Sequence, residues 1–438
     1  MSGLGGAGGA GGAGGAGGAG GAGGAGGAGG GGAGGVYDQG GGGIPCDGPL
    51  FAQAQIGHRD GIVGSWRTPE DVTLRFDLQR FEPLDDYRQL WRWEPWVRAT
   101  AFDFELLSSL RFSIETDATT SVQSAQLWHR SATAGVGDVK IVSLSRPDVK
   151  VFEAQAEWLD FYSDLRDDRM AEILCQLGPQ HAFWSMLIYL QPSRTPRTIE
   201  LLDAAVRLAI FTEIRFKHAI AAPRAIEYSS QVQPMIQTPG HGSLPSGHST
   251  QAFIIAVVLC ALFNQQPGSV YHQQVMRQAY RVAVNRTVAG VHFPVDSMAG
   301  HVLGTALGKY FVARCTHNLP PPAPSPAPPP APQRDPTMYT RSDGKITPRS
   351  FMGNLVTAAN NPDFDYHEPL SEDDVTLYAK SHGKDPTNGA VRDAIKAQFP
   401  FLQWATPDVV VDGSNILSWL WNQAEGEWNG NSLANTKF

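Results

Sequence analysis

The sequence contains little cysteine and no excess of positive charge. It has 4 cysteines in 438 residues, and their spacing fits no metal-binding knuckle. We therefore assign neither a disulfide nor a metal to them, and we expect Cys260, inside an apolar run, to be a buried thiol. The net charge of −8 argues against a general nucleic-acid-binding protein, because such proteins cluster lysine and arginine to neutralise phosphates.

Long apolar runs and a standard secretory signal are also missing. No stretch reaches the roughly 18 consecutive apolar residues that span a bilayer, and the best candidate, Ala252–Phe263, better fits a buried helix. Met1–Leu4 contains neither a basic region nor an apolar run before the glycines begin. We expect a soluble protein without membrane or nucleic-acid partners, and we leave its cellular compartment and export by another route open.

Composition divides the chain into five regions. Gly-Gly-Ala repeats offer almost no side-chain surface for packing, which predicts a disordered tail, whereas a Pro/Ala-rich stretch favours an extended linker. A hydrophobic fraction of 42% indicates a packed interior elsewhere. The predicted regions are the tail at 1–43, an N-terminal region that packs on the core at 44–147, a catalytic helical bundle at 148–318, the linker at 319–337 and a C-terminal module of unknown role at 338–438.

Apolar residues recur at three- and four-residue spacing beyond Pro147, which predicts amphipathic helices and a mainly α fold. The region before Pro147 mixes aromatic clusters with short alternating stretches such as Val72–Phe76, whose arrangement we do not predict. The helices expected in the bundle are 151–177, 180–190, 197–220, 249–264, 269–284 and 294–314, and those expected in the C-terminal module are 372–381 and 388–398, before a tryptophan-rich stretch at 417–428.

Two short segments carry side chains suited to binding an anion. Lys217 and Arg224 are seven residues apart, which on a helix leaves about 20° between them, provided that Pro223 does not redirect the chain. Ser246 and Gly247, in a Pro-Ser-Gly-His sequence, run directly into an apolar helix, whose unpaired first N–H groups attract oxyanions. Taken alone, a solvated basic face and an ordinary helix cap remain alternative interpretations.

A third segment contains Arg286, His292 and Asp296. Five residues separate the arginine from the histidine, and three separate the histidine from the aspartate. Pro294 suits the first position of a helix, so we expect His292 in the loop just before it. Asp296 would then accept the imidazole N–H, fix the tautomer and raise the basicity of the other nitrogen. A structural histidine is the alternative interpretation.

Together the three segments resemble the signature of the superfamily that contains type 2 phosphatidic acid phosphatases and vanadium-dependent haloperoxidases. The matching pattern is Lys, six residues, Arg, then Pro-Ser-Gly-His, then Arg, five residues, His, three residues, Asp. Ala225 replaces a frequent Pro and Asn285 a frequent Ser, and the resemblance covers about 151–314. It implies a helical bundle of the haloperoxidase and acid phosphatase type.

The resemblance also implies a role for each motif residue. Vanadate or phosphate would be held by the anion-binding residues Lys217, Arg224, Ser246, Gly247 and Arg286. His292 would ligate vanadium or attack phosphorus, and His248 would act opposite it as acid or base. Asp296 would support His292.

Two enzyme activities share such an anion site. One is vanadate-dependent oxidation of halide by hydrogen peroxide to hypohalous acid, which then halogenates a small organic acceptor. The other is a soluble acid phosphatase acting through a phosphohistidine, and a non-catalytic phosphate-binding protein is a third alternative. The lipid phosphatases of the superfamily lie in membranes, and His241 occupies a position where similar bromoperoxidases also have His, so we expect a haloperoxidase that favours bromide. Ile214 stands where haloperoxidases often have Trp, which argues against this activity. Haloperoxidases of this group are commonly oligomers, and we leave open whether this chain forms a homo-oligomer.

Overall fold

The computed structural model describes residues 49–65, 83–118, 121–133, 135–178, 180–317, 343–360, 363–405 and 407–428. The predicted tail at 1–43, the stretch Val72–Phe76 and the predicted linker at 319–337 lie outside the described residues. The chain divides into two compact units, of which one contains Val97–Phe438 and the other Gly23–Trp96. The secondary structure described in the smaller unit is helix α3 (Pro49–Val63) and the 3₁₀ helix η3 (Tyr87–Arg92).

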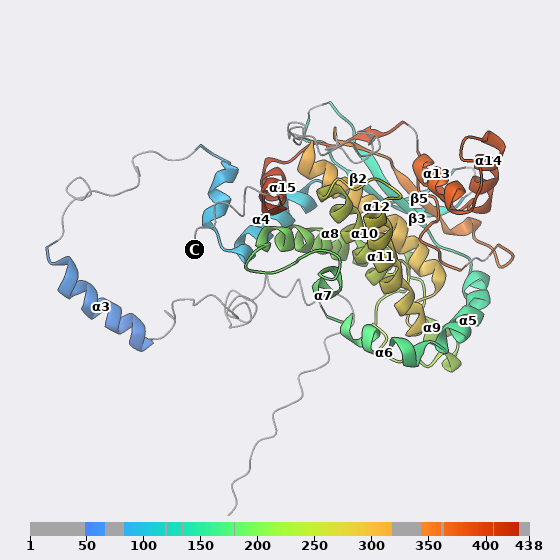
Figure 1. Ribbon diagram of the computed structural model, residues 1–438, viewed down its shortest axis with the longest axis horizontal. Helices are drawn as coiled ribbons and strands as arrows, with labels where there is room; N and C mark the ends of the chain where they lie inside the picture. Colours follow the sequence, from blue (N-terminus) through green and yellow to red (C-terminus); the bar gives the residue numbers. More distant parts are fainter. Residues whose placement is uncertain are drawn as a thin grey trace, which may run out of the picture. The chain divides into compact units, whose positions relative to one another are not determined.

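Two helices buried on all sides form the centre of the larger unit. α10 (Gly247–Leu262) and α12 (Pro294–Thr316) have buried residues around their whole circumference, as expected of helices inside a core. α8 (Pro196–Ile220) and α11 (Val270–Val288) pack against α10, and Figure 1 shows the four helices side by side. The shorter helical elements are α4 (Pro95–Ser108), α5 (Val149–Ser163), α6 (Arg166–Cys175), α7 (His181–Trp184), α9 (Ala225–Tyr228) and η4 (Ser230–Val232).

Glycines of α12 allow close packing of α12 on α10. A Cβ atom at Gly304 would lie 2.4 Å from the carbonyl oxygen of Thr250, and one at Gly300 would lie 2.7 Å from the carbonyl oxygen of Ser246. Gly308 is in similarly close contact with α10. Because the glycines are four residues apart, they share one face of the helix. The two backbones therefore touch where a side chain would hold them apart.

We predict that Gly304→Ala lowers the free energy of unfolding by about 1–3 kcal/mol, because the new methyl group forces the two helices apart. The measurement is urea denaturation followed by circular dichroism. Gly426→Ala is the matched control, since Gly426 also lies in a helix but has nothing within 4 Å of its virtual Cβ atom. Equal unfolding midpoints for Gly304→Ala and the unsubstituted protein would contradict the close packing.

A five-stranded sheet combines strands that precede the helices of the bundle in the sequence with strands that follow them. Its strand order is β1-β2-β3-β5-β6, in which β3 and β5 are parallel and the other neighbours antiparallel. α12 packs against both β3 and β5. A two-stranded sheet pairs β4 with β7. The strands are β1 (Leu110–Thr116), β2 (Gln123–His129), β3 (Val139–Ser145), β4 (Lys345–Ile346), β5 (Arg349–Met352), β6 (Leu402–Trp404) and β7 (Val409–Val410), and the 3₁₀ helix η5 (Gly353–Leu355) follows β5.

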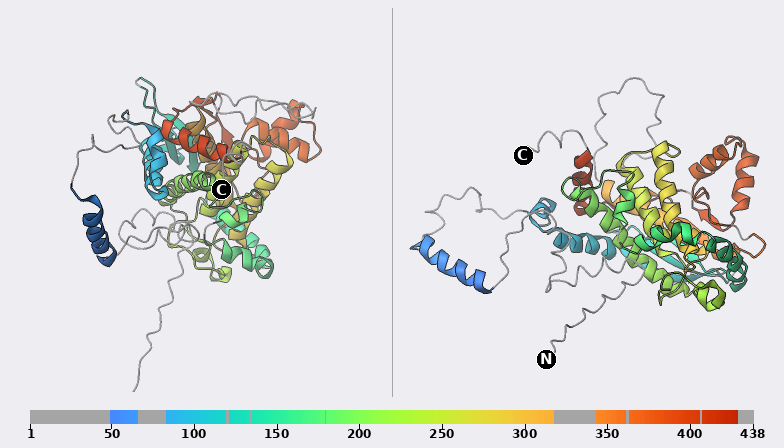
Figure 2. Two further views of the ribbon diagram at one scale, coloured as in Figure 1. Left: turned by 60° about the vertical axis from the view of Figure 1, so that its left-hand side comes forward. Right: turned by 60° about the horizontal axis from the view of Figure 1, so that its bottom comes forward.

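The C-terminal segment contributes three helices as well as strands. α13 (Glu372–Ser381) and α14 (Gly389–Gln398) pack on each other, and α15 (Asn415–Trp428) packs on α8 and α12. Figure 2 shows the orange pair and the red helix on different sides of the bundle. The described C-terminal residues thus share the sheet and the core of the bundle, while the proposed division of the chain at 319–337 stays a prediction.

The mainly helical class is confirmed, but two of the expected helices are wrong. The helix expected at 151–177 is interrupted between Ser163 and Arg166, where the Arg166 guanidinium donates to the backbone carbonyls of Val232, Gln233 and Val288. The helix expected at 180–190 shortens to the four residues of α7. Contacts with distant segments override the local periodicity at the interruption. Cys260 is a buried free thiol, as expected.

Candidate active site

A cavity of about 310 Å³ brings the three sequence segments together. It lies at the start of α10, between α8, the end of α11 and the loops that contain His241 and His292. Ser246 and Asp296 are fully buried and are linked by a hydrogen bond from the Ser246 N–H to the Asp296 carbonyl (2.8 Å). The predicted residues that line the cavity are Lys217, Arg224, His241, Gly247, His248, Arg286 and His292.

Lys217 and Arg224 converge by a route different from the one predicted. α8 ends at Ile220, and Ala221 adopts a left-handed conformation with φ of 49°. Arg224 therefore lies beyond the helix, and the geometry predicted for the pair on one helix is wrong, although both side chains line the cavity. The Lys217 ammonium donates to the carbonyls of Ser243 (3.0 Å), Gly242 and Pro245, which ties α8 to the turn before Ser246.

Arg224 connects two histidines. Its Nη2 donates to Nδ1 of His241 (3.0 Å), and its Nη1 donates to Nε2 of His292 (3.1 Å). Burial lowers the pKa of His241 to about 4, helped by the charge of Lys217, and burial with the charge of Arg224 lowers the pKa of His292 well below 6.5. Both imidazoles are therefore neutral at pH 7, and the lone pairs of His241 Nδ1 and His292 Nε2 accept these hydrogen bonds.

The start of α10 has the geometry expected of an anion-binding helix terminus. Ser246 is the N-cap, and its hydroxyl accepts a hydrogen bond from the Ser249 N–H. Gly247 is therefore the first helical residue, whose N–H has no acceptor within the helix. A Cβ atom at Gly247 would lie 2.7 Å from Oε1 of Glu213, so a larger residue would displace a carboxyl group that lines the cavity.

Gln176, which follows α6, orients His248 and Arg286. His248 Nε2–H donates to the Gln176 carbonyl (3.0 Å), which leaves Nδ1 with the lone pair. Arg286 Nη2 donates to Gln176 Oε1 (2.7 Å), whereas its Nε and Nη1 are buried without a hydrogen-bond partner. Burial lowers the pKa of Arg286 to about 9, so the side chain is still a cation at pH 7. A buried cation with two unused donors is suited to an anionic ligand.

His292 and Asp296 have the relation predicted from the sequence. α12 begins at Pro294, and Nδ1 of His292 donates to Oδ2 of Asp296 (3.1 Å). The same oxygen accepts hydrogen bonds from the Phe293 N–H (2.9 Å) and the Ser243 hydroxyl. Burial raises the pKa of Asp296, while these hydrogen bonds oppose that rise. The carboxyl group fixes the ring so that Nε2 faces Arg224.

Three residues of this site were not predicted from the sequence: Gln176, Glu213 and Ser243. Glu213 lies four residues before Lys217 and so on the same face of α8, a spacing from which it could have been found. Gln176 and Ser243 act through contacts between distant segments, for which the sequence gives no local signal.

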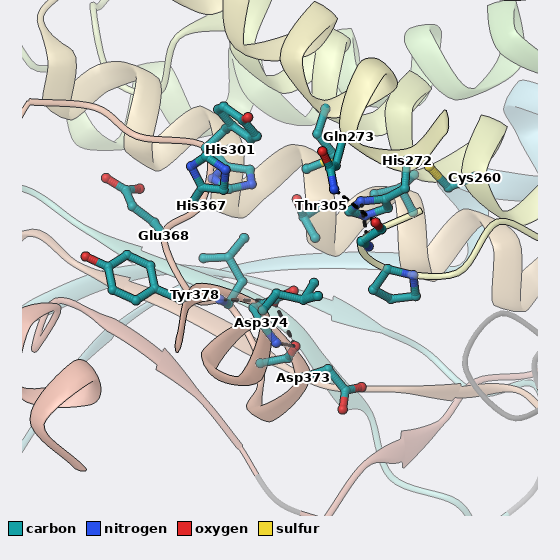
Figure 3. Close-up of a pocket in the computed structure, with 18 of the residues that line it drawn as sticks. Cys260, His272, Gln273, His301, Thr305, His367, Glu368, Asp373, Asp374 and Tyr378 are labelled. Atoms are coloured by element: carbon teal, nitrogen blue, oxygen red, sulfur yellow. Dashed lines mark hydrogen bonds between the residues drawn. The ribbon is translucent and has the colours of Figure 1, made fainter. Parts of the chain in front are cut away.

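A second cavity, of about 390 Å³, lies between α10, α11, α12 and the C-terminal segment. Figure 3 shows His272, His301 and Thr305 facing it from one side and Asp373 and Asp374 from the other. Among the described residues no group of three or more His, Cys, Asp or Glu could hold a metal ion. The two cavities have no lining residue in common. None of the site residues predicted from the sequence lines the larger cavity.

The sequence profile of the PAP2 superfamily matches residues 203–319. This stretch forms a PAP2 superfamily domain. The superfamily includes vanadium haloperoxidases and type 2 phosphatidic acid phosphatases, and its fold binds phosphate or vanadate at the active site. No curated protein matches the sequence. Within the described ranges, no helix has the length and apolar character that crossing a membrane requires.

The PAP2 match narrows the region of resemblance. It begins inside α8 and ends just after α12, so it includes the Lys217, Ser246 and His292 segments but not Gln176. PAP2 domains are usually enzymes, either phosphatases or haloperoxidases. Gln176, which follows α6, and the strands that follow residue 343 lie outside the matched residues.

Proposed function

We propose that the protein is a vanadate-dependent haloperoxidase that uses hydrogen peroxide to oxidise halide, with bromide preferred, to hypohalous acid. The observation that carries the proposal is the position of His241, which lines the cavity and contacts Arg224 beside His292. The resembling bromoperoxidases also have His at this place, where the fungal chloroperoxidases have Phe, which supports the preference for bromide.

The residues present fit a tetrahedral oxyanion. Arg286 has two buried donors without partners, and Gly247, which lines the cavity, is the first residue of α10 and has an N–H without an acceptor in the helix. Arg224 and Lys217 add positive charge, and His292 supplies one nitrogen lone pair. In this assignment Arg286, Gly247 and Arg224 would bind the oxygens of vanadate, and His292 Nε2 would ligate the metal.

His248 is placed to move a proton. Burial and the charge of Arg286 lower its pKa to about 3, so it is a neutral base at pH 7. Because Nε2–H donates to Gln176, the basic nitrogen is Nδ1, which would take the proton of hydrogen peroxide. Vanadate, when bound, supplies Lewis-acid activation of the peroxide toward halide. Asp296 keeps His292 in the tautomer that presents Nε2.

A phosphatase is the second candidate, favoured by Ile214. This residue lines the cavity at the place where haloperoxidases often have Trp. In this case His292 Nε2 would form the bond to phosphorus as the ester P–O bond breaks, and His248, once Nδ1 has taken up a proton, would donate that proton to the leaving alcohol. Water would then release phosphate from the histidine. The same residues thus serve both activities.

The deciding experiment compares the two activities in one preparation. Purified apo-protein receives orthovanadate, hydrogen peroxide and bromide with a halogenation indicator, and a parallel sample receives a phosphomonoester without vanadate. We expect bromination that requires both vanadate and protein and that falls when phosphate is added first, because the two ions compete for one site. Rapid phosphate release without any bromination would overturn the proposal in favour of the phosphatase.

A further inference from the structure

Glu213 places a carboxyl group inside the cationic cavity. It lies one helical turn before Lys217, lines the cavity together with Gly247 and Arg286, and is only 3% exposed. Its Oε1 is close enough to Gly247 that a Cβ atom there would lie 2.7 Å away. An anion that approaches the start of α10 therefore meets a carboxyl group as well as donors.

One oxygen of this carboxyl group is unused. Oε1 accepts a hydrogen bond from Nε2 of Gln251 (3.0 Å), while Oε2 is buried and has no hydrogen-bond partner. Lys217, although close, directs its ammonium hydrogens to three backbone carbonyls. A buried oxygen without a partner destabilises the fold, so its presence in a ligand cavity points to a partner supplied by the ligand.

The chemistry of that partner follows from charge. Two negative groups in a buried cavity repel each other strongly unless a proton lies between them. Either a protonated Glu213 donates to the anion, or an ionised Glu213 accepts from an O–H of the anion. Hydrogen phosphate and hydrogen vanadate carry such an O–H at neutral pH, whereas sulfate is fully ionised.

We propose that Glu213 is a specificity residue that shares one proton with the bound oxyanion, so that the cavity accepts hydrogen phosphate and hydrogen vanadate and rejects sulfate. The inference rests on the oxyanion site of the proposed function, but it holds equally for the haloperoxidase and for the phosphatase. Sites built around a hydrogen bond from the ligand discriminate strongly against an analogue that lacks the hydrogen, because a buried acceptor then stays unpaired.

The preference for phosphate over sulfate should weaken as the pH falls. Burial raises the pKa of Glu213 from 4.5 to about 7, while the charge of Lys217 opposes the rise. Below this value the neutral acid donates a hydrogen bond to either anion, and above it the carboxylate repels sulfate. The other groups that face the cavity are Lys217 on α8, His248 on α10, Arg286 on α11, and Arg224, His241 and His292 in the loops. At pH 8 both anions are mainly doubly charged, so these charges largely cancel in the ratio of the two affinities. Below pH 7 phosphate becomes mainly singly charged, but this change is the same for the unsubstituted protein and for Glu213→Gln, so comparison of the two isolates the effect of Glu213.

The test is isothermal titration of the full-length apo-protein with inorganic phosphate and with sulfate at pH 5.5 and pH 8. At pH 8 we expect phosphate to bind at least about 100-fold more tightly than sulfate, and at pH 5.5 we expect that ratio to shrink about tenfold or more. In Glu213→Gln the ratio at pH 8 should fall below about fivefold, because the amide N–H donates to sulfate as well.

Glu200→Gln is the matched control, because Glu200 is a buried glutamate of the same helix that pairs with Arg98 and does not line the cavity. It should keep the discrimination of the unsubstituted protein. Equal binding of phosphate and sulfate at pH 8 would overturn the role of Glu213 while leaving an oxyanion site in place. Absence of binding by either anion at both pH values would overturn the oxyanion site itself and the Glu213 role with it. Both of these outcomes are measured on the unsubstituted protein, so the test remains valid if Glu213→Gln does not fold.

Discussion

His292→Ala is expected to abolish bromide oxidation, with a fall of at least about 1000-fold in kcat. Among the described residues that line the cavity, His292 alone donates its Nδ1–H to Asp296 and directs the lone pair of its Nε2 at Arg224. Alanine removes the nitrogen that would hold the metal and leaves the Asp296 carboxyl group without its imidazole partner. Steady-state bromination with saturating vanadate measures the loss.

His218→Ala is the control for this variant, because His218 is an exposed histidine next to Lys217 that does not line the cavity. It should retain bromination within about twofold, as surface substitutions usually do. The circular dichroism melts of both variants establish that they fold. A His292→Ala protein that folds and brominates at a rate close to that of the unsubstituted enzyme would exclude His292 as the metal ligand.

Arg286→Met is expected to weaken phosphate and vanadate binding by about 100-fold or more. The substitution removes two buried donors that have no partner in the protein and also removes one of the three cations that line the cavity. Burial lowers the pKa of Arg286 to about 9, so the folded apo-protein disfavours the charged form of this side chain. A flexible apolar side chain of similar length should therefore not lower the melting temperature of the apo-protein. Binding and apo-stability should therefore separate in this variant.

Titration calorimetry with phosphate and a thermal melt without it measure these two effects. Arg281→Met is the control, since Arg281 lies on the same helix but pairs with Glu172 outside the cavity. That variant should bind phosphate normally. Unchanged phosphate affinity in Arg286→Met would show that the ion does not contact the unused donors.

The parts of the site that could be predicted from the sequence are those set by local geometry. Ser246 as a helix cap and His292 before a helix that begins at Pro294 follow from residue types at fixed offsets, and the structure has both. The contact between His292 and Asp296 follows from the same offsets.

The remaining features depend on contacts between distant segments. The position of Arg224 depends on the left-handed Ala221, a conformation that a non-glycine residue seldom adopts and that the sequence did not indicate. Gln176 reaches His248 only because α6 packs against α11. The pairing of β3 with β5 joins residues about 200 positions apart, from Val142 to Arg349, and no local pattern of alternation specifies a partner at that distance.

The glycine contacts between α10 and α12 have a consequence for how the ion is exchanged. His248 lies at the start of one helix and Asp296 at the start of the other, and the two backbones touch at Gly300, close to both. Helices in backbone contact have little freedom to shift, so departure of the ion leaves the arrangement of its ligands intact. In the proposed haloperoxidase, loading with vanadate would then be a competition with phosphate in the surrounding medium, decided by the concentrations and affinities of the two ions, and would require no refolding of the chain.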